Sequence, residues 1–389
     1  MLKAIFSAIF LLGIIFQSQG LSLGSDSNCH LPLKPVAYGF FAPLVFNADD
    51  GKFFGQFSFT TNDTILLSAG DSVIVSCMPG YFKSFPKLKF LKAKCVEGEV
   101  FELEDGKRES WSKSFACELR VVEEIIAPRL EGCPEAAQSI EFGFINPHTR
   151  TSNIVGEACY SVQEGRTIFA HMRDPSVVRI EDTRYLSSGR HPEGRDKINL
   201  FRALRQDRVN DLLQERMGRH GLPMIGSRPL LTGQMLDYPQ LHLITRLTWN
   251  YAITHNDDSM QGWNNLQSDV EKQSRKEDVE VWVGSSGVQT LKDLSGQSFD
   301  FYLDEKKFPV PKYLWLVVKI ADKTSGFLFS NTPHNLKTEI CSDSCSAIDW
   351  ISHPEANDLQ CCSLEKLRQI VPEIPQNQIS PPPNAERSV

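Results

Sequence analysis

Short apolar runs separated by turn residues dominate the first third of the chain. Residues 65–67 and 72–76 are two such runs, and Phe recurs at close intervals over 52–59. Runs of this length, bounded by Gly, Asp, Asn and Ser, are typical of strands in a small β-rich domain. A stretch with Pro and Gly at 128–134 marks the end of this pattern. We therefore predict a first, β-rich domain over residues 21–133.

Residues 197–219 have the spacing of an amphipathic helix, because apolar side chains recur there at intervals of three and four. Gly221 and Pro223 are expected to end this helix. Several arginines lie between the apolar positions: Arg202, Arg205, Arg208, Arg216 and Arg219.

The second half of the chain contains longer apolar runs. Residues 241–253, 279–283 and 313–320 are predicted to form buried strands. Residues 363–371 favour a short helix. The prolines beyond them predict a loose C-terminal tail over 372–389, so the second domain is expected to span 134–371.

The first twenty residues have the form of a secretory signal peptide. Lys3 precedes an apolar run over residues 4–16, and the small residues Ser18 and Gly20 suit cleavage. The run is too short to cross the ~30 Å hydrocarbon layer of a membrane. We expect a signal peptide over residues 1–20 and a mature protein that is secreted and extracellular, with no membrane association.

Cysteine content agrees with this compartment. All ten cysteines follow residue 20, and in an oxidising environment they are expected to form disulfides, whose pairing the sequence leaves open. No Cys-x-x-Cys pair is present, which argues against a zinc ribbon. Asn62-Asp63-Thr64 is an acceptor sequence for N-glycosylation, so we expect a glycoprotein.

Charge is unevenly distributed along the chain. The whole sequence has 41 basic and 48 acidic side chains and a net charge of −7, which disfavours a polyanionic partner. Residues 160–234 differ, with thirteen Arg or Lys against nine Asp or Glu, a local excess of four positive charges. Twelve of the thirteen are arginine, whose planar guanidinium suits phosphate.

A recognisable motif lies within the second domain. Residues 231–234 read Leu-Thr-Gly-Gln, Asn250 follows, and 259–267 read Ser-Met-Gln-Gly-Trp-Asn-Asn-Leu-Gln. Strand-like segments at 279–288 and 308–317 come next.

Over about residues 134–350 these segments resemble the DNA/RNA non-specific endonuclease family, the ββα-metal nucleases. Within the family the chain is most similar to nuclease-like proteins secreted in saliva. The resemblance implies an α+β fold: a ββα-metal nuclease-like domain with mixed sheets and flanking helices, preceded by a small disulfide-stapled β-rich domain.

The family's catalytic positions are altered in this sequence. In the family a His acts as general base and an Arg stabilises developing charge on phosphorus. The resemblance places Gln234 at the base position and Thr232 at the arginine position. An amide cannot accept a proton near neutral pH, and loss of a general base alone costs about 10²–10⁴-fold in rate.

The family's metal positions are altered as well. An Asn normally holds a single Mg²⁺ and a Glu orients a metal-bound water. Ser259 stands at the Asn position and Gln267 at the Glu position. A hydroxyl is a weaker Mg²⁺ ligand than an amide carbonyl oxygen, and the change from Glu to Gln removes a negative charge beside the metal. Only Asn250 and the framework residues Gly233 and Trp263 match. The resemblance therefore implies no cofactor, with Mg²⁺ needed if activity persists.

Nucleic-acid contacts are the part of the family function that this sequence retains. Arg166 is the best match to an arginine that contacts the substrate backbone in the family. The local arginine excess extends this surface to the predicted helix. The expected nucleic-acid-binding residues are Arg166, Arg202, Arg205, Arg208 and Asn250.

The leading hypothesis is a secreted protein that binds DNA and RNA without sequence preference and has little or no hydrolytic activity. One alternative is an active Mg²⁺-dependent endonuclease with a rearranged site, in which His255, Asn256, Asp257 or Asp258 supplies the base or the metal ligands. A second alternative is a secreted module that engages a host protein through its first domain. Many members of the family dimerise, which leaves a homodimer open.

Overall fold

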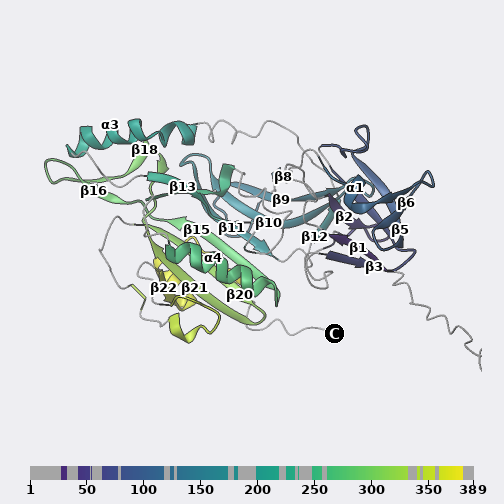
Figure 1. The fold of residues 1–389 in the computed structure, drawn as a ribbon. Helices are drawn as coiled ribbons and strands as arrows, with labels where there is room; N and C mark the ends of the chain where they lie inside the picture. The colour runs from purple at the N-terminus through teal and green to yellow at the C-terminus, as the bar shows by residue number, and fades with distance from the viewer. Residues whose placement is uncertain are drawn as a thin grey trace, which may run out of the picture.

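The computed structural model describes the chain in sixteen stretches. These are residues 28–32, 43–52, 54, 64–77, 80–117, 123–126, 129–173, 179–182, 199–218, 225–232, 235, 248–255, 261–331, 340–341, 345–354 and 359–379. Two sheets dominate them: a five-stranded sheet at the right of Figure 1 and a nine-stranded sheet that runs through the middle of the molecule.

The N-terminal module is built on a five-stranded antiparallel sheet in the order β2-β4-β5-β6-β7. A two-stranded sheet of β1 and β3 and the short helix α1 complete it. Their bounds are β1 Cys29–Pro32, β2 Leu44–Asn47, β3 Thr64–Leu67, β4 Ser72–Ser76, β5 Phe90–Glu97, β6 Val100–Leu103, β7 Arg108–Ser110 and α1 Trp111–Ser114.

Two disulfides and a compact aromatic core hold this module together. Cys29–Cys95 joins β1 to β5, and Cys77–Cys117 ties the end of β4 to the segment after α1. Trp111 stacks on Phe115 with ring centroids 5.0 Å apart. A domain this small buries little apolar surface, so covalent links add needed stability.

The second sheet has nine strands, with the order β22-β21-β20-β15-β11-β10-β9-β8 and β12 paired with β10. Their bounds are β8 Glu123–Ile126, β9 Gln138–Asn146, β10 Thr151–Ser161, β11 Arg166–Arg173, β12 Arg179–Asp182, β15 Val279–Ser286, β20 Tyr313–Ile320, β21 Lys323–Ser330 and β22 Leu359–Cys362.

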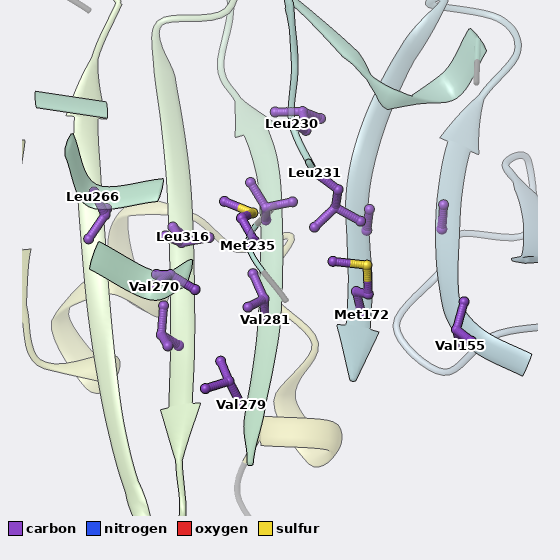
Figure 2. Close-up of a cluster of buried hydrophobic side chains, with 14 of the residues drawn as sticks. Val155, Met172, Leu230, Leu231, Met235, Leu266, Val270, Val279, Val281 and Leu316 are labelled. Atoms are coloured by element: carbon purple, nitrogen blue, oxygen red, sulfur yellow. The ribbon is translucent and has the colours of Figure 1, made fainter. Parts of the chain in front are cut away.

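Both faces of the central strands are buried. In β20, Leu316 and Val318 point into one apolar cluster, whereas Trp315 and Val317 point into another. Helix α4 (Gln261–Ser274) covers the first face. Figure 2 shows its Leu266 and Val270 beside Val279, Val281 and Leu316.

The opposite face is covered by the C-terminal segment. Leu367 of α5 (Leu364–Ile370) and Ile379 of α6 (Gln376–Ile379) are buried there against Trp282 and Trp315. The disulfides Cys133–Cys159 and Cys341–Cys362 lie in this second cluster, whereas Cys345–Cys361 lies in the first.

The remaining elements are short. Three antiparallel pairs are formed by β13 with β14, β16 with β17 and β18 with β19. Helix α3 lies at the end of the molecule opposite the N-terminal module (Figure 1). The bounds are β13 Ile225–Pro229, β14 Tyr251–His255, β16 Thr290–Lys292, β17 Ser298–Asp300, β18 Tyr302–Asp304, β19 Lys307–Pro309, α3 Gln206–Met217, and single turns at Thr248–Asn250 (η5) and Cys345–Ala347 (η7).

The module and the large sheet share a core. Leu44 and Phe46 of β2 and Ile74 of β4 belong to the same buried cluster as the large sheet's first face. The Nδ2 of Asn146 also donates a 3.1 Å hydrogen bond to the carbonyl oxygen of Gly51. The first sheet therefore packs against the second through one of its own faces.

The protein is thus mostly β, with few helices and five disulfides. The expected mixed sheets are not found, because every pairing between the named strands described here is antiparallel. The large sheet begins with β8 at Glu123, ten residues before the expected boundary. Among the residues in view, no helix is long and apolar enough to cross a membrane.

Two predicted segments differ from the structure. The helix expected over 197–219 is interrupted at Leu204 and Arg205, and α3 ends at Gly218, whose φ of 62° suits a left-handed helix end. The tail expected from residue 372 is packed as far as Ile379, because Ile374 and Ile379 bury their side chains in the second core.

A buried histidine links three strands of the large sheet. His171 stacks on Trp282 with ring centroids 4.4 Å apart. Its Nδ1 lies 3.4 Å from Oε1 of Glu157, and its Nε2 lies 3.5 Å from Oε1 of Glu280. Burial opposes ionisation of Glu280, but His171 and Lys319 outweigh it and lower the pKa of this carboxyl to about 2.

Replacing Glu280 by Gln should lower the free energy of unfolding at pH 7 by about 1–3 kcal/mol, since a partly buried charged partner is lost. A depressed folded pKa means that the contribution of Glu280 is complete above about pH 4.5 and is lost as the pH falls towards about 2. Urea denaturation of wild type and Glu280→Gln between pH 7 and 2 should show the difference shrinking over that window. The exposed Glu277→Gln is the control, and a difference that persists at pH 2 would contradict the assignment.

Candidate nucleic-acid interface

Three segments of the nuclease-like motif converge in the structure. The backbone N–H of Leu231 donates to Oδ1 of Asn250 at 2.7 Å, and Nδ2 of Asn250 donates to the carbonyl oxygen of Leu231 at 2.6 Å. Helix α4 joins them, because Nε2 of Gln267 donates to the carbonyl oxygen of Leu230 at 3.3 Å. The motif's residues are thus brought together from positions 230, 250 and 267.

This convergence rests on the main core. Leu230, Leu231 and Met235 point into the cluster that contains Met172 and Val281 (Figure 2). Burial of the side chains on both sides of Thr232 fixes that segment, with Thr232 itself half-buried.

Asn250 has a structural role. Its side chain is fully buried, and its amide satisfies both backbone groups of Leu231. The prediction that Asn250 contacts nucleic acid does not fit this burial. Asn250 instead positions the segment that contains Leu231 and Thr232.

Of the four positions at which the resemblance expects catalytic or metal-binding residues, two lie within the described residues. Gln234 and Ser259 lie outside the described residues, as do Gly233 and the polar run at 256–258. Thr232 and Gln267 are described, and neither carries a charge. The described part of the motif therefore supplies no anionic ligand for Mg²⁺. The amide nitrogen of Gln267 is engaged in a hydrogen bond to the carbonyl oxygen of Leu230.

His255 is placed for structure. The ring is buried, and its Nε2 lies 3.0 Å from Oε1 of Gln289. Its backbone N–H donates to Oδ1 of Asn331, whose Nδ2 in turn donates to the carbonyl oxygens of Ile253 and Pro311. These contacts join β14 to the segments after β15 and β21, and they disfavour His255 as a general base acting on a substrate in solvent.

Gln289 and Asn331 were not expected to form a network with His255. Each is a polar residue between apolar strands, and both are buried. Such residues could have been noticed in the sequence as polar interruptions, but not paired with one another.

Arg166 does not present a guanidinium to solvent. Its side chain is 20% exposed, and Nε donates to Glu164 at 2.5 Å. Nη1 donates to the carbonyl oxygen of Ser285, and Nη2 lies 3.7 Å from Oε1 of Glu373. Two carboxylates already neutralise this arginine, so it holds β11 to the C-terminal segment and is not placed as a phosphate ligand.

The arginines around α3 differ from one another. Arg205 forms a two-point ion pair with Asp207, with Nη2 2.6 Å from Oδ2. Arg202 and Arg208 are exposed. Among the described residues no carboxylate lies within 4.0 Å of Arg202 or Arg208, so these two are the better placed for a phosphate.

Arg208 also lines a cavity of about 180 Å³ between α3 and the β17–β18 segment. Arg216 lies over the ring of Phe299 there, 5.0 Å from its centroid. Three carboxylates share the lining, those of Asp300, Asp304 and Glu305. Because they offset the two guanidinium groups, the cavity does not favour a bare phosphate.

No grouping of three or more His, Cys, Asp or Glu side chains suited to a metal ion occurs in the ranges that the structure describes. Metal binding by Ser259 stays a prediction, because that residue is outside those ranges.

Comparison with known proteins adds little to this picture. No family model matches the chain, and no curated protein matches it. Among solved structures, a chain from the crystal structure of the EndoG/EndoGI complex, which concerns the mechanism of EndoG inhibition, aligns with a TM-score of 0.26 and 13% identity. The alignment covers 55% of this chain and 79% of that chain. A likeness this low supports no conclusion about activity.

The Asn250–Leu231 contact generates a stability prediction. Asn250→Ala leaves a buried N–H and a buried carbonyl without their side-chain partner, so it should lower the free energy of unfolding by about 2–4 kcal/mol. Urea denaturation followed by Trp fluorescence measures this. The matched control is Asn264→Ala on the exposed face of α4, expected within about 0.5 kcal/mol of wild type. Equal effects of the two changes would show that the Asn250–Leu231 hydrogen bonds do not stabilise the fold.

Proposed function

We propose that this chain is a secreted protein that binds DNA and RNA without sequence preference, on a nuclease-like framework whose catalytic residues are replaced. The proposal is carried by one observation: the segments that carry the motif are held together by hydrogen bonds, whereas uncharged side chains stand at its described functional positions. Asn250 still holds Leu231, and Thr232 and Gln267 stand where the resemblance expects Arg and Glu.

Loss of hydrolysis follows from the chemistry of the replaced groups. A phosphodiester hydrolase of this kind needs a base, a metal and a positive charge near phosphorus. Gln234 cannot act as a base, and Thr232 carries no charge. The alternative of an active enzyme that uses His255 is disfavoured, because that ring is buried and bonded to Gln289.

Nucleic-acid binding is supported by exposed arginines near α3. Arg202 and Arg208 each offer a phosphate a planar pair of donors, independent of base sequence. Arg208 also faces the three carboxylates of its cavity, so Arg202 is the stronger of the two candidates. The five disulfides are compatible with an extracellular protein, in agreement with the N-terminal signal predicted from the sequence. The resemblance that we draw from the motif residues to nuclease-like proteins of saliva is our ground for proposing capture of host nucleic acid as the biological use.

The test is a gel-shift assay and a nuclease assay on one preparation of the full chain. We expect a shift of both DNA and RNA that weakens steeply as salt rises, and no product with Mg²⁺. A second protein, Gln234→His with Ser259→Asn, restores two family residues and is expected to gain cleavage. Absence of binding near physiological salt would refute the proposed function, and rapid Mg²⁺-dependent cleavage by the wild type would favour an active enzyme.

The arginines give a separate prediction. Reversing two charges in Arg202→Glu with Arg208→Glu should weaken binding to any sequence about tenfold and lower the slope of log affinity against log salt by roughly two. Fluorescence anisotropy with labelled oligonucleotides at several salt concentrations measures both quantities. Arg129→Glu with Arg275→Glu changes the net charge equally at two arginines that are already paired, and should leave the slope unchanged.

A further inference from the structure

The N-terminal module carries a second basic surface, distinct from the α3 arginines. We name it the lysine patch. It occupies residues 81–94, a stretch that contains no Asp or Glu. Its members are Lys83, Lys87, Lys89, Lys92 and Lys94, together with Tyr81, Leu88 and Phe90.

Strand β5 arranges part of the patch as a row. Leu91, Ala93 and Cys95 point into the module's core, so Phe90, Lys92 and Lys94 alternate with them on the other face of β5. That face continues from the one on which Phe46 and Ile74 pack against the large sheet; Lys92 is half-buried there, whereas Phe90 and Lys94 are exposed. Residues two apart along a strand lie ~7 Å from one another. An aromatic ring and two ammonium groups therefore follow each other along one straight line.

The loop that precedes β5 is held in place. Phe82 is fully buried and packs edge-on against Phe85 and Phe115. The disulfide Cys77–Cys117 lies directly beneath it, and the backbone N–H of Cys77 donates to the carbonyl oxygen of Lys89. A preformed surface loses less conformational entropy when a ligand binds.

Four of the five lysines of the patch form no close ion pair with a described residue, although Lys94 lies across from Glu102 of β6 in the strand register. Among the described residues no carboxylate lies within 4.0 Å of Lys87, Lys89, Lys92 or Lys94. The neighbouring hairpin differs, because its Lys107 is paired with Asp105 at 2.8 Å. Residues 97–109 carry six acidic and two basic side chains, so opposite charges occupy adjacent parts of the module.

The aromatic members suggest which polyanion fits. Tyr81 and Phe90 are each 40% exposed and Leu88 is 44% exposed, so part of each side chain is accessible from solvent. Nζ of Lys89 lies 5.6 Å from the centroid of the Tyr81 ring. Three half-exposed side chains provide little apolar area for insertion into a lipid surface. Interleaved lysines and rings are instead suited to phosphates and unstacked bases.

We propose that the lysine patch binds an unpaired stretch of DNA or RNA, with lysine ammonium groups at the phosphates and Phe90 and Tyr81 stacked on bases. The inference rests on the proposed nucleic-acid-binding function and assigns the N-terminal module a direct part in it. The patch and α3 belong to opposite ends of the molecule (Figure 1), so it is a separate contact surface.

The test compares binding of single-stranded and duplex oligonucleotides to the full chain by fluorescence anisotropy. The charge variant is Lys92→Gln with Lys94→Gln, and the stacking variant is Phe90→Ala. We expect each variant to weaken binding of the single strand about tenfold, with the duplex affected less than threefold. The charge variant should also lower the salt slope for the single strand by roughly 1.4.

Lys52→Gln with Lys107→Gln is the matched control, because both lysines lie in the same module and are exposed but paired with Asp50 and Asp105. All affected side chains are at the surface, and unchanged thermal unfolding verifies the fold of each variant. The control should bind the single strand as wild type does.

The outcomes separate the two proposals. If wild type binds no nucleic acid, the proposed function fails. If wild type binds and the patch variants bind equally well, the proposed function stands and the lysine patch is excluded. If the patch variants weaken binding of single strand and duplex equally, the patch does not select an unpaired strand and the proposal fails. The variants are also tested for binding to vesicles that contain anionic lipid. If they lose binding to the vesicles but not to the single strand, the patch is a membrane contact and the proposal fails.

Discussion

In the central strands of the large sheet, successive side chains enter two different apolar layers, so each face needs its own cover. Helix α4 covers one face and the C-terminal segment through Ile379 covers the other. Strand β2 of the N-terminal module extends the first layer with Leu44 and Phe46. This two-sided burial determines where the N-terminal module, helix α4 and the last described residues lie, because an apolar face exposed to water would be costly.

The same layer fixes the candidate site. Backbone groups near Leu231 are removed from water by the core, and the side chain of Asn250 supplies their hydrogen bonds. The hydrogen bonds between Asn250 and Leu231 stabilise the fold whether or not the protein has catalytic activity. The Asn250–Leu231 contact does not involve the side chain of Thr232, whereas Gln267 adds a hydrogen bond of its own to the carbonyl oxygen of Leu230.

Sequence patterns predicted the strands well where apolar runs were short and bounded by polar residues. Strands β4 and β20 have the predicted limits, 72–76 and 313–320. Apolar spacing did not reveal the break in the helix at Leu204, because the apolar positions continue through it. The pairing of Arg166 with Glu373 joins residues about two hundred positions apart, and no local pattern could indicate it. The motif predicted that the segments at Leu231, Asn250 and Gln267 belong together, whereas the burial of Asn250 and His255 depended on tertiary packing. The lysine patch was visible as a run without acidic residues, but its outward row became evident only from the strand's register.

The shared core between the module and the large sheet has a consequence for how the two parts respond to ligands. None of the five disulfides joins them, so their connection depends on the packing of Leu44, Phe46 and Ile74 and on the Asn146–Gly51 hydrogen bond. Unfolding the module would expose apolar surface on both sides of this contact. Any ligand that binds only the folded module therefore shifts the equilibrium of the whole layer, including the segment at Leu231, by thermodynamic linkage. Two distant surfaces are in this way coupled through a common folding equilibrium, without any movement of one part relative to the other.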